Sequence, residues 1–474
     1  MATIILIIYI AGILGVIIYA SKLVRSVDDY FLAGRKLSWW VAGGSIAATA
    51  VGGATVIGYP GSYYSIGADW YFMFPAVLLA ALFMAFFVAR RVRALGRYTL
   101  PELLELRYDK SARIVAAVII IIADTAVICT QILAFAGSLS GFLGISRDAA
   151  SILGTALFIV TALGGGFIGV AVTDAIQAAV IIAGIIIVSI LALAKAGGFG
   201  ALATLPPQYF EPFTVLPPKV VLGNMLAVMG LILASQSIFF QRLNATKTPA
   251  DAKKASLLYV LVVCITTGSA LPIMGYAARV LFGSGIKPDD VVGMLISEIL
   301  PTWVGALYIA VIIGAILTTT NSILLSVSMN VVKDIYESII KKAASDRTLL
   351  TLGRVTTVAV GIFAYALTKT MPDIIGAILF AYIMTAVIVV PLYGGLFWRR
   401  PGAIAGVLSI VLGGGAALLF HLLKQPWGIH PVIAGYVFGF IGLLLGCVAP
   451  PITEDRWQKI HSAKIETISN EKIS

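Results

Sequence analysis

Apolar segments of membrane-spanning length recur along almost the whole chain, separated by short joints that are polar or rich in glycine and proline. A helix that crosses a bilayer needs about 20 mostly apolar residues, so each such segment predicts one transmembrane helix. Thirteen segments qualify, at approximately 3–20, 38–64, 70–89, 114–142, 148–164, 170–195, 220–241, 256–278, 303–332, 350–368, 375–397, 402–422 and 431–448. The pattern therefore predicts an all-α integral membrane protein.

The same segments divide the chain. Residues 1–449 are expected to form one membrane domain, in which helix 3–20 precedes a core of about 38–397 and two extra helices follow within 402–448. Residues 450–474 form a polar tail that is too short for a catalytic or signalling domain of its own. Composition excludes a soluble globular protein, because the 474 residues are 60% hydrophobic and only 12% charged.

The basic residues predict the orientation in the membrane. Segment 3–20 has no basic residue before it and is followed by Lys22 and Arg25, which favours an uncleaved helix with its N-terminus outside. In that orientation 26 of the 33 lysines and arginines fall in inner loops or the tail. The C-terminus is then cytoplasmic, the membrane is the plasma membrane, and no basic residue is expected at its centre. This bias and anionic lipid explain the net charge of +11 without a nucleic-acid partner.

The residues that most often build enzyme or metal centres are scattered. The three cysteines and three histidines stand without metal-ligand spacing, at Cys129, Cys264, Cys447, His421, His430 and His461. We therefore expect no enzyme activity and no metal centre of the cysteine or histidine type. A membrane solute sensor is an alternative, but it would need an output domain that the tail is too short to supply.

Two predicted spans contain helix-breaking features. Span 38–64 holds the glycine-rich run SIAATAVGGATVIGYPGS, and span 220–241 carries Gly230 and then the polar cluster 235–237. With helix 3–20 set aside, these spans begin two successive five-span units, and an odd repeat length inverts the second unit. The sequence thus predicts a 5+5 inverted-repeat core with broken first and sixth core helices, typical of a transporter site. The alternative is close helix packing through small residues.

Span 303–332 contains a cluster of hydroxyls, in AILTTTNSILLS. Ala315, Thr318 and Thr319 are spaced i, i+3 and i+4, so both hydroxyls lie over the face of the Ala315 carbonyl. Thr318, Asn321 and Ser322 repeat this spacing one turn further on. Neutral hydroxyl and carbonyl oxygens suit an alkali cation, although each hydroxyl could instead bond back to its own helix.

Two carboxylates fall inside predicted spans, where burial is costly and function is the default explanation. Asp174 lies about one turn inside its span, and Asp124 lies deeper, with Gln131 two turns further along the same face. Either could bind a cation or carry a proton. The alternatives are an interfacial position for Asp174 and a structural hydrogen bond for Asp124.

Six stretches resemble the sodium:solute symporter family, whose members have the inverted-repeat fold of the LeuT-type transporters. They are DDYFLAGRKLSWWVAGGSIAAT at 28–49, GRYTLPELLELRY at 96–108, VAVTDAIQ at 170–177, FFQRLNATKTPADAKKASLL at 239–258, GAILTTTNSILLSVSMNVVKDIY at 314–336 and AYIMTAVIVVPLYGGLFWRR at 381–400. The resemblance implies a symporter that imports a small organic solute with sodium by alternating access. Proton coupling through Asp174 or Asp124 is the alternative mechanism.

The resemblance also implies site residues. Sodium would be held between the broken first core helix and the eighth by Ala48, Val51 and Ala315 carbonyls and by the Thr318 and Thr319 hydroxyls. A second cation or proton site would use Asp174, Thr318, Asn321 and Ser322, although Asn321 replaces the usual hydroxyl. Sodium is the only metal expected.

Helix position alone suggests a solute cavity lined by Gly52, Gly53, Thr55, Gln131, Gln236 and Tyr382. Ala50, Met229 and Ile232 stand where sugar-transporting relatives carry polar or gating residues, which disfavours a sugar. The run GGATVIG looks more like relatives that move small monocarboxylates, pantothenate, choline or amino acids.

Overall fold

The computed structural model describes residue 4, residues 8–13, residue 15 and residues 26–340, 344–370 and 373–462. Within this part of the chain all regular secondary structure is helical, apart from two isolated β-bridges. Eleven helices of the described part are long and apolar enough to span a membrane, and one bent helix pair there makes a twelfth if it is counted as a single span. The predicted span 3–20 lies largely outside the described residues. The other twelve predicted spans are all found.

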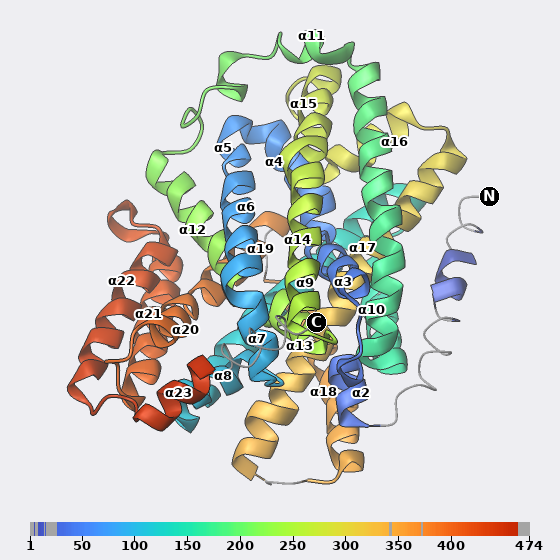
Figure 1. Ribbon diagram of the computed structural model, residues 1–474. Coiled ribbons are helices and arrows are strands. Elements are labelled where there is room, and N and C mark those ends of the chain that lie inside the picture. The colour runs from blue at the N-terminus through green and yellow to red at the C-terminus, as the bar shows by residue number, and fades with distance from the viewer. Residues whose placement is uncertain are drawn as a thin grey trace.

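Ten of these spans, in two successive groups of five, form the core, and Figure 1 shows how the helices are arranged. The first five are built from α3 (Trp39–Ala50), η2 (Ala54–Gly58), α4 (Tyr59–Ile66), α5 (Ala68–Tyr71), α6 (Met73–Phe83), η3 (Met84–Val88), α7 (Ala89–Leu95), α9 (Lys110–Leu143) and α10 (Arg147–Lys195). The second five are built from α12 (Pro218–Ala234), η5 (Gln236–Phe240), α13 (Gln241–Ala245), α14 (Pro249–Ile265), η6 (Thr266–Ala270), α15 (Leu271–Phe282), α17 (Thr302–Met329), η8 (Asn330–Ile340), α18 (Asp346–Leu367), α19 (Ile374–Ala386) and α20 (Val389–Phe397).

The remaining helices flank the core. Helices α21 (Ala403–Leu422) and α22 (Pro431–Leu445) are the two extra spans, and they pack on each other beside the core. Short helices cover the ends of the bundle: α2 (Val27–Leu32), η1 (Ala33–Arg35), α8 (Leu100–Arg107), α11 (Gly198–Leu202), η4 (Pro207–Tyr209), η7 (Pro288–Asp290), α16 (Val291–Ile299), η9 (Pro426–Gly428), η10 (Gly446–Val448) and α23 (Glu454–Ser462).

The core helices pack in pairs that recur with a shift of five spans. In the first unit α3 packs against α10 and α14, and in the second unit α12 packs against α19 and α6. Likewise α9 packs against α19, and α17 packs against α10. Two copies of one five-helix unit produce this recurrence, which agrees with the predicted inverted repeat.

Helix α10 contains two predicted spans with almost no joint between them. The sequence pattern left residues 165–169 between spans, but the backbone leaves helical geometry only at Gly166, where φ is 53° and ψ is −171°. This conformation is open essentially to glycine alone. A single residue therefore turns the chain between the fourth and fifth core helices.

Replacing Gly166 with alanine is expected to lower the free energy of unfolding by about 1–3 kcal/mol, because a Cβ strains this backbone conformation. The melting temperature of the purified protein in detergent measures the effect. Gly415→Ala in α21 is the matched control, since an added methyl group there meets nothing within 4 Å. Equal losses in the two variants would contradict the assignment.

Several ion pairs lie at two opposite ends of the bundle, and their basic residues are ones that the sequence assigned to different sides of the membrane. At one end, near α8 and α23 at the bottom of Figure 1, Arg113 bonds Glu102, Glu105 and Asp334. At the other end, near α11 and α16, ion pairs join Arg147 to Asp290, Lys195 to Glu298 and Lys369 to Asp148. The basic residues of these pairs therefore fall into the same two groups that the sequence assigned to opposite sides of the membrane.

Candidate functional site

The first core helix breaks in the middle of the bundle. Helix α3 ends at Ala50, Val51 leaves helical geometry with φ −95° and ψ 59°, and the chain resumes as a helix bent by 55°. A helix end leaves its last carbonyls without backbone partners. Here threonine hydroxyls bond them: Thr318 donates to the Ala48 carbonyl at 3.0 Å, and Thr319 donates to the Thr49 carbonyl at 2.9 Å.

The two threonines of α17 also reach a carbonyl of their own helix. Thr318 lies 2.9 Å and Thr319 lies 3.1 Å from the Ala315 carbonyl oxygen. Two hydroxyl protons therefore serve three carbonyl oxygens, so the cluster holds more lone pairs than protons. Both side chains are buried, at 2% and 4% exposure, and they point at the helix break and not at lipid.

This oxygen cluster fits a sodium ion. All its donors are neutral hard oxygens, and the C-terminal end of α3 adds a partial negative charge from the helix dipole. The structure brings together Ala48, Ala315, Thr318 and Thr319 of the predicted set, with Val51 at the break itself. The Thr49 carbonyl, which the sequence did not suggest, is the one that accepts from Thr319.

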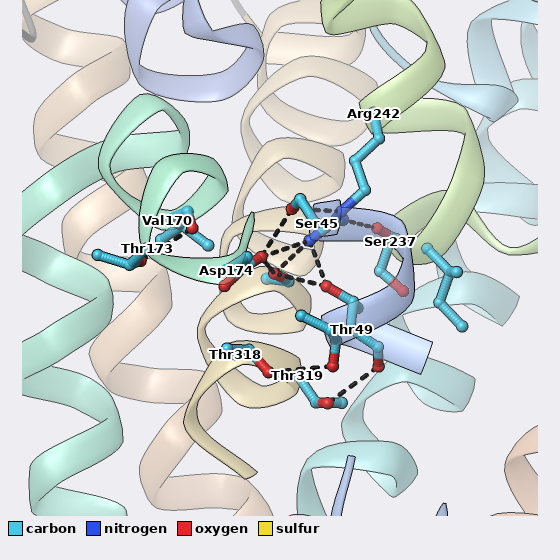
Figure 2. Close-up of polar contacts among 12 residues, drawn as sticks. Ser45, Thr49, Val170, Thr173, Asp174, Ser237, Arg242, Thr318 and Thr319 are labelled. Atoms are coloured by element: carbon cyan, nitrogen blue, oxygen red, sulfur yellow. Dashed lines mark hydrogen bonds and ion pairs between the residues drawn. The ribbon is translucent and has the colours of Figure 1, made fainter. Parts of the chain in front are cut away.

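The predicted second site is organised around an arginine. The Oδ2 atom of Asp174 accepts from Ser45 at 2.7 Å and from Arg242 Nη2 at 3.2 Å, and Arg242 also donates to Ser322 at 2.5 Å (Figure 2). Asn321 turns away and accepts from Thr161 at 2.8 Å. Of the four predicted residues, only Asp174 and Ser322 meet around one centre, because Thr318 bonds carbonyls one turn away.

The buried arginine corrects the expectation that Arg242 lies in an inner loop. Arg242 was assigned to an inner loop because the apolar run stops at residue 241, yet its side chain is 0% exposed. The sixth core helix breaks at Ser235 and then continues through η5 and α13 to Ala245, which carries Arg242 inside. The signal in the sequence that could have indicated this is Asp174, an acid within a predicted span that needs a partner.

Comparison with known proteins identifies the chain's relatives. The sequence model of the sodium:solute symporter family matches residues 30–413. The chain belongs to the sodium:solute symporter family. This symporter is 26% identical to the osmoregulated proline transporter OpuE of Bacillus subtilis, over 94% of each protein. It is also 26% identical to the sodium/pantothenate symporter of Escherichia coli, over 93% of this chain and 95% of that protein.

A solved structure shares the fold. A Na⁺-coupled sialic acid symporter in a substrate-bound outward-open state matches with a TM-score of 0.84 and 22% identity, over 95% of this chain and 98% of that one. The predicted all-α inverted-repeat fold is confirmed. Family membership also confirms a multi-pass membrane transporter, not an enzyme, that moves small organic solutes with sodium as the coupling ion.

The symporter has a small cavity beside the break in α3. Its lining includes Thr55 and Tyr382 from the predicted set, together with Ala50, Val51, Tyr59, Val228, Leu231, Ile232, Ile238, Tyr259, Thr266 and Thr267. The space is about 30 Å³, enough for a water or two. No charged side chain is among the lining residues, so the cavity offers only apolar surface, hydroxyls and backbone groups.

Other predicted cavity residues have different surroundings. Gln131 accepts from the backbone amide of Gly53 at 2.8 Å and so holds the broken helix from the side of α9. Gly52 packs against Thr319, which leaves no room for a side chain. Gln236 does not line the cavity; its Oε1 accepts from the Leu100 amide at 2.6 Å, toward α8.

A stripe of polar residues begins one turn beyond the oxygen cluster and runs along α17 and η8 toward α8. Ser322, Ser326, Asn330 and Asp334 follow one another at intervals of four along α17 and η8, and all are buried. Asp124 of α9 faces this stripe beside Ser326 and Ser237. Its Oδ2, the Ser326 hydroxyl and both polar atoms of the Asn330 amide have no hydrogen-bond partner among the described residues. Buried polar groups without a protein partner are places where an ordered water molecule or an ion can bind.

A wider vestibule of about 310 Å³ lies at the end of the bundle where Arg147 pairs with Asp290 and Lys369 with Asp148. Its lining contains Ile57 of η2 and five charged residues, Arg147, Asp148, Asp289, Lys369 and Asp373. Burial, and then the nearby Asp373 carboxylate, raise the pKa of Asp289. The vestibule lies at the end that the basic residues predict to be outside.

Proposed function

We propose that this symporter imports one small organic solute with sodium bound by the Ala48, Val51 and Ala315 carbonyls and the Thr318 and Thr319 hydroxyls. One observation carries the proposal: two buried threonine hydroxyls bridge the carbonyl end of a broken helix to a second helix. A cation there supplies the positive charge that three carbonyls and a helix C-terminus attract.

Sodium would couple to the solute by tying α3 to α17. The break that supplies the ion's ligands also borders the cavity through Ala50 and Val51. An ion that fixes this break therefore shapes the solute site and favours the state open to the vestibule. The sodium ion would then be released to the inside along the polar stripe, past Ser326 and Asn330 toward α8.

The driving force is sufficient for strong accumulation. One charge crossing about 100 mV releases about 2.3 kcal/mol, and a tenfold sodium gradient adds about 1.4 kcal/mol. Together these sustain an accumulation of about 500-fold for a neutral solute. Proton transfer by Asp124 or Asp174 is not required for this.

The solute class follows from the cavity lining. Aliphatic side chains, the Tyr59, Tyr259 and Tyr382 rings and threonine hydroxyls all line the cavity, which suits a solute with an apolar body and one polar head. We propose a monocarboxylate, a pantothenate-like acid, a choline-like amine or an amino acid. The amides freed at the helix break can hold a carboxylate without a basic side chain.

The orientation we propose has the N-terminus outside, the C-terminus in the cytoplasm and the protein in the plasma membrane. Its support is the sorting of the ion pairs described above. Impermeant maleimide should label Lys219→Cys in intact cells and should label Lys253→Cys only after lysis. The reverse pattern would invert the assignment.

Counterflow in liposomes tests the function. Vesicles loaded with each candidate solute should take up the labelled form of one class in sodium and not in potassium. Liposomes with the Thr318→Ala/Thr319→Ala variant provide the matched control and should lose the sodium-dependent part. Solute uptake that is equal in both salts and abolished by a protonophore would overturn the proposal.

A further inference from the structure

Asp124 is a buried carboxylate without a basic partner. It lies near the middle of α9 and is 4% exposed. No lysine or arginine of the described residues forms an ion pair with it, whereas Asp174, the other carboxylate within a predicted span, contacts the guanidinium of Arg242 at 3.2 Å (Figure 2). A carboxylate at this depth is costly unless a positive charge compensates it. Asp124 therefore attracts a cation from outside the protein.

The polar groups around Asp124 have unused bonding capacity. Ser326 of α17 and Ser237 of η5 lie beside its carboxylate. Asn330 follows Ser326 by one turn on the same side of the helix, and α9 packs against both α17 and η8. Ser326 and Asn330 are 0% exposed, and neither they nor the Oδ2 atom of Asp124 have a side-chain hydrogen-bond partner within the described part of the chain. These side chains therefore form a buried polar pocket that is ready for a ligand.

The unused oxygens suit a small monovalent cation. A carboxylate, a hydroxyl and an amide carbonyl are all hard oxygen donors. One positive charge balances the single carboxylate, whereas a divalent ion would leave a surplus. The described residues contain no group of three or more His, Cys, Asp or Glu side chains that would hold such an ion. Water could satisfy the hydrogen bonds, but it would leave the charge of Asp124 uncompensated.

The pocket lies between the proposed sodium site and the predicted inner end of the bundle. Ser326 follows Thr318 by eight residues, which is about 12 Å along α17 in the direction of α8. One turn beyond Asn330 the polar stripe is closed by Asp334, whose Oδ1 atom accepts from Arg113 at 2.7 Å and from Thr99 at 2.8 Å. An ion that leaves Thr318 inward therefore reaches Asp124 before it reaches this closure.

We propose that Asp124, with Ser326 and Asn330, binds the sodium ion after it leaves Thr318 and Thr319 and before it enters the cytoplasm. This inference rests on the proposed function for the first sodium site. A position on an exit path must also let the ion go. Asp124 therefore binds sodium more weakly than the first site does, and it equilibrates with the sodium inside. High internal sodium keeps the position filled and slows the release of the next ion.

Proteoliposomes with increasing internal sodium, balanced by potassium, test this. Asp124→Asn removes the charge with little change in volume and should raise the internal sodium concentration for half-inhibition of solute uptake by about 10- to 100-fold. The external sodium concentration for half-maximal uptake should stay close to the wild-type value, because the first site keeps its ligands. Ser326→Ala should shift the internal value in the same direction. Ser328→Ala is the matched control, since its buried hydroxyl bonds the Gly353 carbonyl at 2.8 Å, away from the pocket.

The melting temperature gives a readout that does not depend on transport. In the Thr318→Ala/Thr319→Ala protein it should still rise when sodium replaces potassium, at concentrations above those that fill the first site of the wild type. An ion at Asp124 stabilises the folded state only. Adding Asp124→Asn should abolish this rise. The same response in the double and the triple variant would overturn the inference.

The uptake experiment also separates the other occupants of the pocket. Wild-type inhibition by internal sodium in folded Asp124→Asn and Ser326→Ala proteins would mean that the pocket holds only water, and it would overturn the inference. The same result together with a lost response to internal pH in Asp124→Asn would assign a proton to the carboxylate and would also overturn it. Wild-type uptake that does not depend on external sodium would instead count against the first site.

Discussion

Replacing Thr319 with alanine is expected to raise the sodium concentration for half-maximal uptake by about 10- to 100-fold, because a hydrogen bond or ligand to a charged group contributes about 1.5–3 kcal/mol. Thr319 bonds the Thr49 and Ala315 carbonyls at 2.9 and 3.1 Å. Its loss removes one ligand and leaves the end of α3 less firmly held. Thr318→Ala should act similarly through the Ala48 carbonyl.

Two controls isolate the hydroxyl. Thr319→Ser keeps the oxygen and should retain most of the sodium affinity. Thr320→Ala removes a neighbouring buried hydroxyl whose one hydrogen bond among the described residues is to the Ile316 carbonyl of its own helix, at 2.7 Å. Initial uptake rates across a sodium series measure all three variants. A shift in Thr320→Ala as large as that in Thr319→Ala would contradict a specific role for Thr319.

Replacing Gly52 with alanine is expected to abolish transport. A Cβ at this position would lie 2.3 Å from Thr319 Oγ1, 2.9 Å from Thr319 Cβ and 3.0 Å from Gln131 Oε1. Neither neighbour can withdraw cheaply, because Thr319 holds two carbonyls and Gln131 holds the Gly53 amide. The helix break and α17 must then separate, which disperses the oxygens of the proposed sodium site.

Uptake by reconstituted protein measures this effect, and size-exclusion chromatography checks that the variant still folds. Gly415→Ala, where an added methyl meets nothing within 4 Å, is the matched control and should transport normally. Wild-type sodium affinity in a folded Gly52→Ala protein would show that α17 and the break need not touch.

The fold and the group of oxygens at the break in α3 could be predicted from the sequence because their signals are local. A 20-residue apolar run, a glycine-rich interruption and an i, i+3, i+4 set of hydroxyls each lie within one helix. The position of each helix break followed from the residues that form it. The resemblance of six stretches to one family then paired α3 with α17, which spacing alone does not.

The residues that sequence reasoning missed depend on contacts between distant segments. Arg242 meets Asp174, 68 positions earlier, and Ser45, 197 positions earlier. Its burial follows from the way the broken sixth helix crosses α3 and α10, which no local pattern reveals. Gln236 was placed by helix position, but the break at Ser235 rotates its side chain toward Leu100.

The central claim is that the Thr318 and Thr319 hydroxyls, at the carbonyl end of α3, bind the coupling sodium. Equilibrium binding of radioactive sodium to purified, solute-free protein tests this claim most directly. Wild-type and Thr320→Ala proteins should bind one ion with equal affinity, and Thr318→Ala/Thr319→Ala should bind none in the same range. Undiminished binding by the double variant would contradict the account.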